Sequence, residues 1–305
     1  MKWNSPIVPQ VCKKETKKMK FSINTNGLKK HYTPAQIVQE CVKAGVQGIE
    51  WGLGAPANAA ADAAEMKRLT EDAGLEIVSF INAGILWKTD DIRRWSEAVL
   101  AGGGKVLRVA HPWFAWDYKE SVHQPDDFMT LVEKSKEGLA RLMELGKEYG
   151  IRYVLETHKG SCFASPLMVP LALKEFDPRY CGVIYDPANT VLEGFVLPRI
   201  AVEVMKEYIA YLHVKNLMFK ETLTPDGRTQ MAVERRPVDK GAVDYVEVMF
   251  ALKLHNWDGW FSFEEFVTSD PACVAEEVRQ GINHLKWCRQ EAKNSLEVPF
   301  LHFNY

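Results

Sequence analysis

The chain has 305 residues, of which 47% are hydrophobic and 26% are charged, a composition typical of a globular protein that buries a large core. The formal net charge is −2 and no stretch interleaves Lys and Arg with aromatic residues, so we expect no nucleic-acid partner. Six cysteines without a CxxC pair argue against a disulfide framework, and no run is long and apolar enough to span a membrane. These features predict a cytoplasmic protein that acts on a small molecule.

The two ends of the chain read differently from its middle. Residues 1–18 carry several lysines but no apolar segment follows them, so they do not form a secretory signal. We expect a loose N-terminal arm over 1–18, one domain over 19–293 and a C-terminal tail over 294–305. The aromatic tail could pack on a neighbouring subunit in a homo-oligomer.

Between these ends, short β-rich runs alternate with amphipathic helical patterns. The predicted strands lie near residues 20–25, 46–51, 76–82, 105–111, 151–157, 180–186, 209–215 and 259–266. Several of these runs are apolar on both faces, as expected when helices cover a parallel sheet outside and side chains fill it inside. The pattern predicts a single-domain α/β protein with a (β/α)8 TIM barrel fold.

The helix boundaries repeat along the chain. Thr33 is a predicted N-cap, and Gln36 completes a capping box with it. The helix that follows ends at Gly45, and the same helix-to-strand junction recurs at Gly74 and Gly150, where glycine can adopt the left-handed conformation. These positions mark the ends of one repeated unit.

Acid and imidazole side chains stand at the ends of four successive predicted strands: Glu156, Asp186, His213 and Glu264. In a TIM barrel the chemistry gathers at the carboxyl ends of the strands. Any one of these carboxylates alone would more often cap a helix or pair with Lys or Arg, but the repetition favours a ligand set, because a charge at the end of an apolar strand is costly unless paired. Three carboxylates and one imidazole suit one divalent metal ion, Mn²⁺, Co²⁺, Mg²⁺ or Zn²⁺. Glu265 competes with Glu264, but strand alternation directs only one of them inward.

Further residues at the same strand ends are candidate contacts to a small carbohydrate substrate: Lys215, Asn189, Arg108, His111, Trp113, Glu50 and Trp51. A structural ion pair is an equal interpretation for Lys215, and core packing is the alternative for the tryptophans. The charged segment 216–241 exceeds the usual length of a βα loop, which suggests a lid, a phosphate clamp or a partner surface.

Residues 19 to 290 resemble the xylose isomerase-like sugar phosphate isomerase/epimerase superfamily of TIM barrels. The resemblance is carried by five motifs: Gly48-Ile49-Glu50, Leu155-Glu156-Thr157-His158, Tyr185-Asp186-Pro187-Ala188-Asn189, Leu212-His213-Val214-Lys215 and Gly259-Trp260-Phe261-Ser262-Phe263-Glu264. It implies that Glu156, Asp186, His213 and Glu264 hold the metal. Members commonly carry an acidic residue after the His-Val-Lys element, where this chain has Asn216.

The resemblance implies proton abstraction next to a carbonyl, through an enediolate, on a ketose, an aldose or a related polyol. Glu156 and Glu264 would flank the reacting carbon as base and acid, giving an isomerase or epimerase. His158 could act as a separate general base, which would also permit elimination, so a lyase or dehydratase acting on a keto-sugar, inosose or 3-keto-glycoside is the alternative. His158 could equally hydrogen-bond Glu156 or another group beside the ligands.

Two other classes of protein use the same barrel. Endonuclease IV cleaves DNA with several zinc ions, but that site needs more histidines at strand ends than this slightly acidic chain offers. A non-catalytic sugar-binding barrel is disfavoured because all four ligands are present.

Overall fold

The computed structural model describes residues 18–294 apart from 55–56, 87–88, 111–126 and 269. Eight of its strands close into a barrel in which β1 pairs with both β2 and β10, and each neighbouring pair is parallel. They are β1 (Lys20–Asn24), β2 (Gly48–Gly52), β3 (Glu76–Ile85), β4 (Val106–Ala110), β5 (Arg152–Glu156), β6 (Cys181–Tyr185), β7 (Ile209–Val214) and β10 (Trp260–Phe263). The predicted TIM barrel is confirmed.

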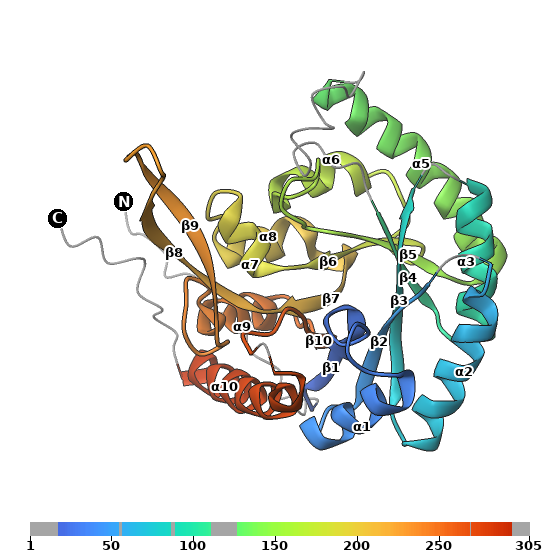
Figure 1. The fold of residues 1–305 in the computed structure, drawn as a ribbon. Coiled ribbons are helices and arrows are strands. Elements are labelled where there is room, and N and C mark those ends of the chain that lie inside the picture. Colours follow the sequence, from blue (N-terminus) through green and yellow to red (C-terminus); the bar gives the residue numbers. More distant parts are fainter. Residues whose placement is uncertain (1–17, 55–56, 87–88, 111–126, 269, 295–305) are drawn as a thin grey trace, which may run out of the picture.

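Helices surround this barrel, as Figure 1 shows. They are α1 (Pro34–Ala44), α2 (Ala59–Asp72), α3 (Thr89–Ala101), α5 (Phe128–Tyr149), α6 (Val169–Leu173), α7 (Pro187–Leu192), α8 (Pro198–Met205), α9 (Tyr245–Leu254) and α10 (Val274–Asn294). Short 3-10 turns lie at η1 (Thr25–Gly27), η2 (Pro166–Met168), η3 (Lys206–Tyr208) and η4 (Pro271–Cys273). Within the described residues, none of these helices has the length and apolarity that crossing a membrane requires.

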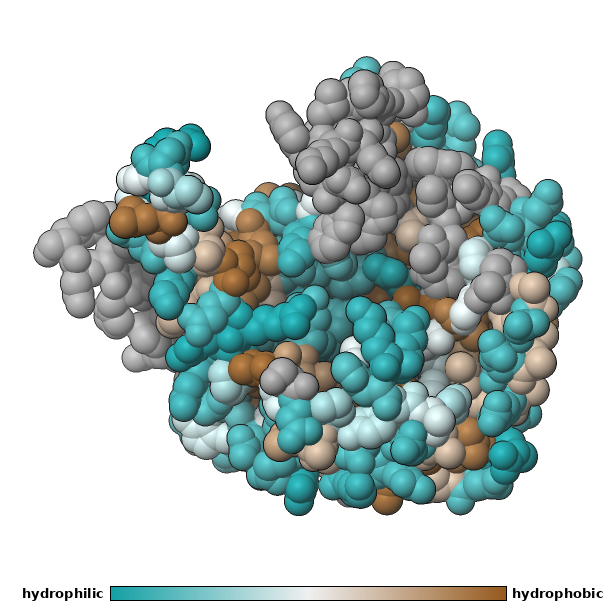
Figure 2. Space-filling model, in the orientation of Figure 1, coloured by the Kyte–Doolittle hydropathy of each residue, from teal (hydrophilic) through white to brown (hydrophobic). Residues whose placement is uncertain are grey.

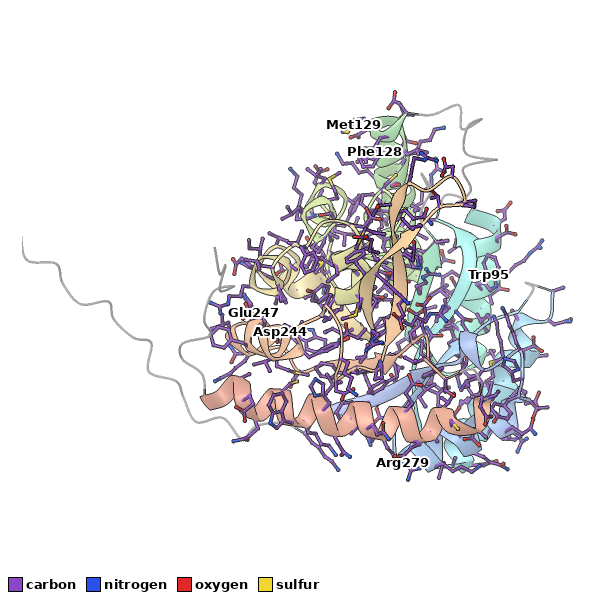
Figure 3. The ribbon with its side chains drawn as sticks, turned by 60° about the vertical axis from the view of Figure 1, so that its left-hand side comes forward. Trp95, Phe128, Met129, Asp244, Glu247 and Arg279 are labelled. Atoms are coloured by element: carbon purple, nitrogen blue, oxygen red, sulfur yellow. The ribbon has the colours of Figure 1, made fainter. Side chains whose placement is uncertain are left out.

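The predicted helix boundaries of the repeated unit are present. The Thr33 side chain accepts a hydrogen bond from the Gln36 backbone, and Gln36 accepts one from the Thr33 backbone at 2.9 Å, which completes the capping box of α1. Gly45 and Gly150 end α1 and α5 with φ of 75° and 67°, a conformation that residues with a Cβ rarely adopt. Asp244, labelled in Figure 3, caps α9, and its Oδ1 accepts hydrogen bonds from the backbones of Val246 and Glu247.

The interior of the barrel is layered. The layer beneath the barrel mouth is apolar and contains Val78, Val154, Ile184 and Tyr211. Because side chains alternate along a strand, the next inward positions on β5 to β7 are Glu156, Asp186 and His213. The polar centre therefore lies in the interior of the barrel above mostly apolar side chains, where its charges are poorly solvated.

The segment 216–241, which exceeds the usual length of a βα loop, is mostly a β-hairpin, and its part as a lid, a phosphate clamp or a partner surface stays a prediction. β8 (Asn216–Leu223) and β9 (Thr229–Arg236) pair antiparallel, and the hairpin stands out from the barrel (Figure 1). Apolar side chains on it are exposed, including Leu223, Met231 and Val233, and hydrophobic surface is visible over it in Figure 2. With little buried on either face, its strands lack the alternation from which a strand is recognised.

Candidate metal centre

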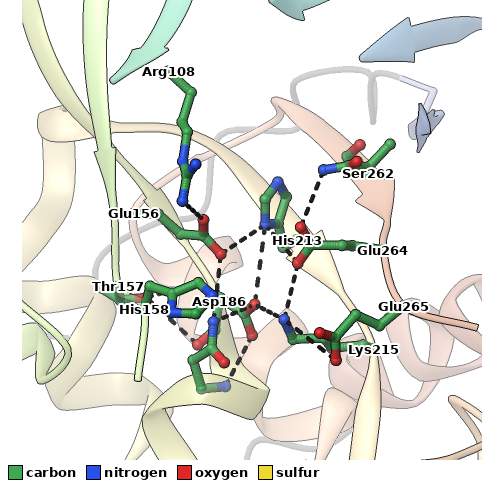
Figure 4. A network of polar contacts seen from close by, with 12 residues as sticks. Arg108, Glu156, Thr157, His158, Asp186, His213, Lys215, Ser262, Glu264 and Glu265 are labelled. Atoms are coloured by element: carbon green, nitrogen blue, oxygen red, sulfur yellow. Dashed lines mark hydrogen bonds and ion pairs between the residues drawn. The ribbon is translucent and has the colours of Figure 1, made fainter. Parts of the chain in front are cut away.

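The structure brings the four predicted ligands together at the barrel mouth (Figure 4). One possible ligand atom from each of Glu156, Asp186, His213 and Glu264 lies within 4.8 Å of the others. Nδ1 of His213 is 3.0 Å from Oε1 of Glu156, 3.1 Å from Oε2 of Glu264 and 4.0 Å from Oδ2 of Asp186. The imidazole thus stands between the carboxylates, with one nitrogen directed at all three.

Asp186 shows how the local sequence builds this centre. It follows β6 directly, and its Oδ1 accepts a hydrogen bond from the backbone of Asn189, so it caps α7. Its Oδ2 accepts from the Asn189 side chain at 2.8 Å and faces the cluster. Capping and ligation, which the sequence presented as alternatives, are compatible because each uses a different oxygen.

Glu156 and Glu264 have matching surroundings. Glu156 accepts from Arg108 Nη2 at 2.9 Å and from Asn189 Nδ2 at 3.4 Å. Glu264 accepts from Lys215 Nζ at 2.8 Å and from Asn24 Nδ2 at 3.1 Å. Each carboxylate therefore has one cationic partner and one amide partner.

Lys215 is the second centre of charge in the site. Its buried Nζ lies 2.8 Å from both Asp186 Oδ2 and Glu264 Oε2, as Figure 4 shows. Burial lowers the pKa of Lys215, but the carboxylates of Asp186 and Glu264 outweigh it and hold that pKa well above the usual range. The ammonium is therefore charged, and it compensates part of the negative charge.

The charge balance of the cluster fits a divalent cation. Its carboxylates are Glu50, Glu156, Asp186 and Glu264, and its cationic side chains are Arg108 and Lys215. With His213 neutral, as a metal ligand must be, two negative charges remain, which the two positive charges of a divalent ion would balance in this mostly buried site. Carboxylate oxygens with one imidazole nitrogen, and no thiolate, are donors that hard or borderline divalent metals accept.

The pKa shifts follow from burial and from these contacts. Burial disfavours ionisation of Glu156 and Glu264, but the positive charge on His213, with Arg108 or Lys215, holds the pKa of both carboxyls well below the usual range. Burial, together with repulsion from those two carboxylates, raises the pKa of Asp186 despite Lys215. Burial lowers the pKa of His213, yet the surrounding carboxylates raise it well above its ordinary value.

Glu50, expected to contact substrate, lies on the other side of the His213 ring from Glu156 and Glu264. It is fully buried, and both of its oxygens are 3.2 Å from Nε2 of His213, the nitrogen that does not face the other carboxylates. It also accepts from Tyr211 and Ser262. The expectation of a substrate contact is corrected, because Glu50 is enclosed by protein groups beneath the mouth.

Trp51, unlike Glu50, lies away from the cluster. Successive residues of β2 face opposite sides of the sheet, and the Trp51 indole is buried in the main core, where its Nε1 donates to Thr70 of α2 at 3.0 Å. Core packing therefore describes Trp51, and the prediction of a substrate contact is corrected. His111 and Trp113, the other predicted contacts after β4, lie outside the described residues.

His158 and Glu265 border the centre. His158 is half-buried and its Nδ1 lies 3.0 Å from the carbonyl oxygen of Lys159; a part in proton transfer stays a prediction. Glu265 has a left-handed backbone with φ of 55°, and its Oε2 is 3.9 Å from Lys215 Nζ. Of the two adjacent glutamates, Glu264 is the one that joins the cluster.

Three polar residues that support the centre were not predicted from the sequence: Asn24, Tyr211 and Ser262. Tyr211 and Ser262 each stand two residues before a predicted ligand, on the same face of their strand. That spacing is the signal that could have found them, because a polar residue buried inside an apolar barrel needs a polar partner.

Comparisons with known proteins agree with this fold. Residues 38–288 match the family described as xylose isomerase-like TIM barrel, and the chain belongs to it. An inosose dehydratase of Bacillus velezensis is 25% identical over 255 residues, which cover 79% of this chain and 83% of that protein.

Solved structures share the barrel at lower identity. A 3-keto-D-glucoside 4-epimerase from E. coli is 16% identical, with a TM-score of 0.68 over 89% of this chain and 100% of that one. A D-psicose 3-epimerase is also 16% identical, with a TM-score of 0.69 over 89% of this chain and 99% of that one. At this identity the likeness establishes the fold alone.

Proposed function

We propose that this protein removes a proton next to the carbonyl of a small polyhydroxy ketone or aldehyde and returns it, as an isomerase or epimerase that uses one divalent metal ion. The observation that carries this proposal is the matched pair of Glu156 and Glu264 on the two sides of His213 Nδ1. Inversion at one carbon needs a group on each face, one to take the proton and one to give it back. Glu156 and Glu264 are comparable candidates, since each has one cationic and one amide partner.

The metal ion would be held by Glu156, Asp186, His213 and Glu264. When bound, it would supply positive charge that stabilises the oxyanion formed as the proton leaves. Arg108 and Lys215 keep Glu156 and Glu264 ionised, so that either carboxylate can accept a proton. Asn24 and Asn189 each donate to one oxygen of a carboxylate, Oε1 of Glu264 and Oε1 of Glu156. Transfer between the two faces of one carbon inverts its configuration, whereas return of the proton to the adjacent carbon interconverts aldose and ketose.

A dehydratase is the second candidate, and the curated relatives favour it, since the first of them is named inosose dehydratase. The proton abstraction is the same in both reactions. In dehydration the carbon–oxygen bond at the β-position then breaks, and an acid protonates the departing hydroxyl so that water leaves. His158, half-buried beside Glu156, is the candidate for that acid.

Deuterium exchange separates these activities. The protein is incubated in D₂O with ketoses, aldoses, inososes and 3-keto-glycosides, in Mn²⁺ or Co²⁺ and in chelator, and the products are followed by NMR and mass spectrometry. Metal-dependent deuterium incorporation with no loss of water or aglycone is the expected result. Loss of water would favour the dehydratase and release of aglycone a lyase, while a bound sugar that never exchanges in the presence of metal would point to a non-catalytic binding protein.

The matched variants are Glu156→Gln and Glu148→Gln. Glu148 lies on the surface of α5, where it pairs with Arg93. Exchange that survives Glu156→Gln at the wild-type rate would contradict the proposal, and Glu148→Gln should leave it unchanged.

A further inference from the structure

The two ring nitrogens of His213 face different groups of carboxylates. Nδ1 lies 3.0 Å from Glu156 and 3.1 Å from Glu264, on the side of the proposed metal ion. Nε2 lies 3.2 Å from both oxygens of Glu50. A neutral imidazole carries one proton, so only the nitrogen without it can bind a metal. Whatever holds the proton on Nε2 therefore leaves Nδ1 free as a ligand.

Glu50 is itself held in place by hydroxyl groups from other strands. Tyr211 on β7 donates to its Oε1 at 2.5 Å, and Ser262 on β10 donates to its Oε2 at 2.6 Å. Ser79 on β3 in turn hydrogen-bonds the Tyr211 hydroxyl at 2.9 Å. All of these side chains are buried in the barrel, whose closed hydrogen-bonding fixes their separations.

The same contacts decide the role of Glu50. A carboxylate only accepts hydrogen bonds, so in the metal-free ring Nε2 donates to Glu50 and Nδ1 donates to Glu156. A metal ion among Glu156, Asp186 and Glu264 would take the place of the proton on Nδ1, whereas Glu50, on the other side of the ring, keeps the proton on Nε2. With each oxygen already engaged by a hydroxyl, the carboxylate cannot turn away from the ring without leaving a buried donor unsatisfied. Four strands thus contribute to one hydrogen-bond network that ends at the imidazole.

We infer that Glu50 is a positioning residue, which holds His213 with its proton on Nε2 and its Nδ1 lone pair directed at the metal ion. This inference rests on the proposed metal-dependent function. It assigns a role to the strand-two glutamate, and it makes Tyr211 and Ser262 the residues that orient Glu50 in turn.

Metal titration tests the inference. Glu50→Gln keeps the shape of the side chain but replaces one acceptor oxygen with a donor group, and Ser262→Ala removes one of the groups that hold Glu50. We expect the Kd for Mn²⁺ to rise about 10- to 100-fold in Glu50→Gln, the range usual for a partner of a metal-ligating histidine, and to rise less in Ser262→Ala. Glu40→Gln is the matched control, because Glu40 is another buried glutamate but bonds Lys43 on α1.

Histidine NMR gives a readout that a purely structural role would not move. Spectra of ¹⁵N-histidine-labelled wild type loaded with Mg²⁺ should show the His213 proton on Nε2, hydrogen-bonded and slow to exchange, and Glu50→Gln should weaken that signal. A proton on Nδ1 in the Mg²⁺-loaded protein, or an unchanged Mn²⁺ Kd in Glu50→Gln, would overturn the inference. If wild type binds neither Mg²⁺ nor Mn²⁺, the proposed function fails. In that case an Nε2 proton in the spectrum of the metal-free protein would still support the hydrogen bond between Glu50 and the His213 ring.

Discussion

Arg235 of the β8–β9 hairpin forms an ion pair with Glu265, the residue next to the proposed ligand Glu264. Nε of Arg235 lies 3.4 Å from Oε2 of Glu265, and the same oxygen lies 3.9 Å from Nζ of Lys215. The backbone of Glu265 is left-handed, with φ of 55°, which costs on the order of 1 kcal/mol for a residue with a Cβ. The hairpin is thereby connected through charges to the metal centre.

Arg235→Ala should change substrate binding more than stability. The pair is half-exposed, and such pairs contribute less than about 1 kcal/mol, so the melting temperature should barely move. Without Arg235, the Glu265 carboxylate has Lys215 as its cationic partner and draws the ammonium away from Asp186, so we expect KM to rise several-fold. Arg228→Ala is the control, because Arg228 pairs with Asp226 near the hairpin turn; equal effects on KM from both variants would refute the connection.

Glu156→Gln should weaken metal binding by at least about 100-fold, because it removes a charged ligand and leaves Arg108 without its carboxylate. Turnover should fall to the level measured in chelator, while the far-UV circular dichroism stays that of wild type. Calorimetric titration with Mn²⁺ measures the first effect. Wild-type affinity in this variant would remove Glu156 from the ligand set.

Trp51→Phe should lower stability and spare activity. The indole is buried and its Nε1 donates to Thr70, so the smaller ring loses both packing and a buried hydrogen bond, at a cost of about 1–3 kcal/mol. Urea unfolding measures this loss, and kcat/KM should stay within twofold of wild type. A large change in KM at unchanged stability would restore Trp51 as a substrate contact.

The barrel was predictable because its signals are local and repeated. Helices that end at glycine and strands that are apolar on both faces recur along the chain, and the helix that begins at Thr33 carries a capping box. Each of these units is consistent with closure of the strands into one barrel. The cluster was predictable for a related reason: acidic and imidazole groups at successive strand ends must meet once the strands close into a barrel.

The roles of Glu50 and Trp51 were not predictable, because they depend on residues that are distant along the chain. Glu50 was recognised as a strand-end residue, but its partner His213 is more than 160 positions away, and no local pattern shows that their side chains meet. Trp51 was misjudged because a strand-end aromatic can face either the mouth or the outer helices, and only the register of β2 decides between them.

Lys215→Met should destabilise the metal-free protein strongly. Nζ of Lys215 neutralises Asp186 and Glu264 in a buried site, and removing one partner of a buried ion pair typically costs about 3–5 kcal/mol. A bound divalent ion would replace the missing positive charge, so the gain in unfolding free energy on adding Mn²⁺ should be larger in the variant than in wild type. Urea unfolding in chelator measures the loss of stability, and urea unfolding in excess Mn²⁺ measures the gain on metal binding. Equal stability of variant and wild type in chelator would contradict the claim that Lys215 neutralises buried carboxylates.

Metal binding should release a proton near neutral pH. In the metal-free protein the carboxylates around His213 raise its pKa well above the ordinary value of an imidazole, so both ring nitrogens carry protons at pH 7. Nδ1 must lose its proton to act as a ligand, while the proton on Nε2 stays with Glu50. Because protons compete with the metal ion below that raised pKa, the apparent Kd should fall as the pH rises toward it. Calorimetry in buffers of different ionisation enthalpy measures the release, with about one proton expected for each Mn²⁺ bound at pH 7; no release, together with a Kd independent of pH, would show that His213 does not bind through Nδ1.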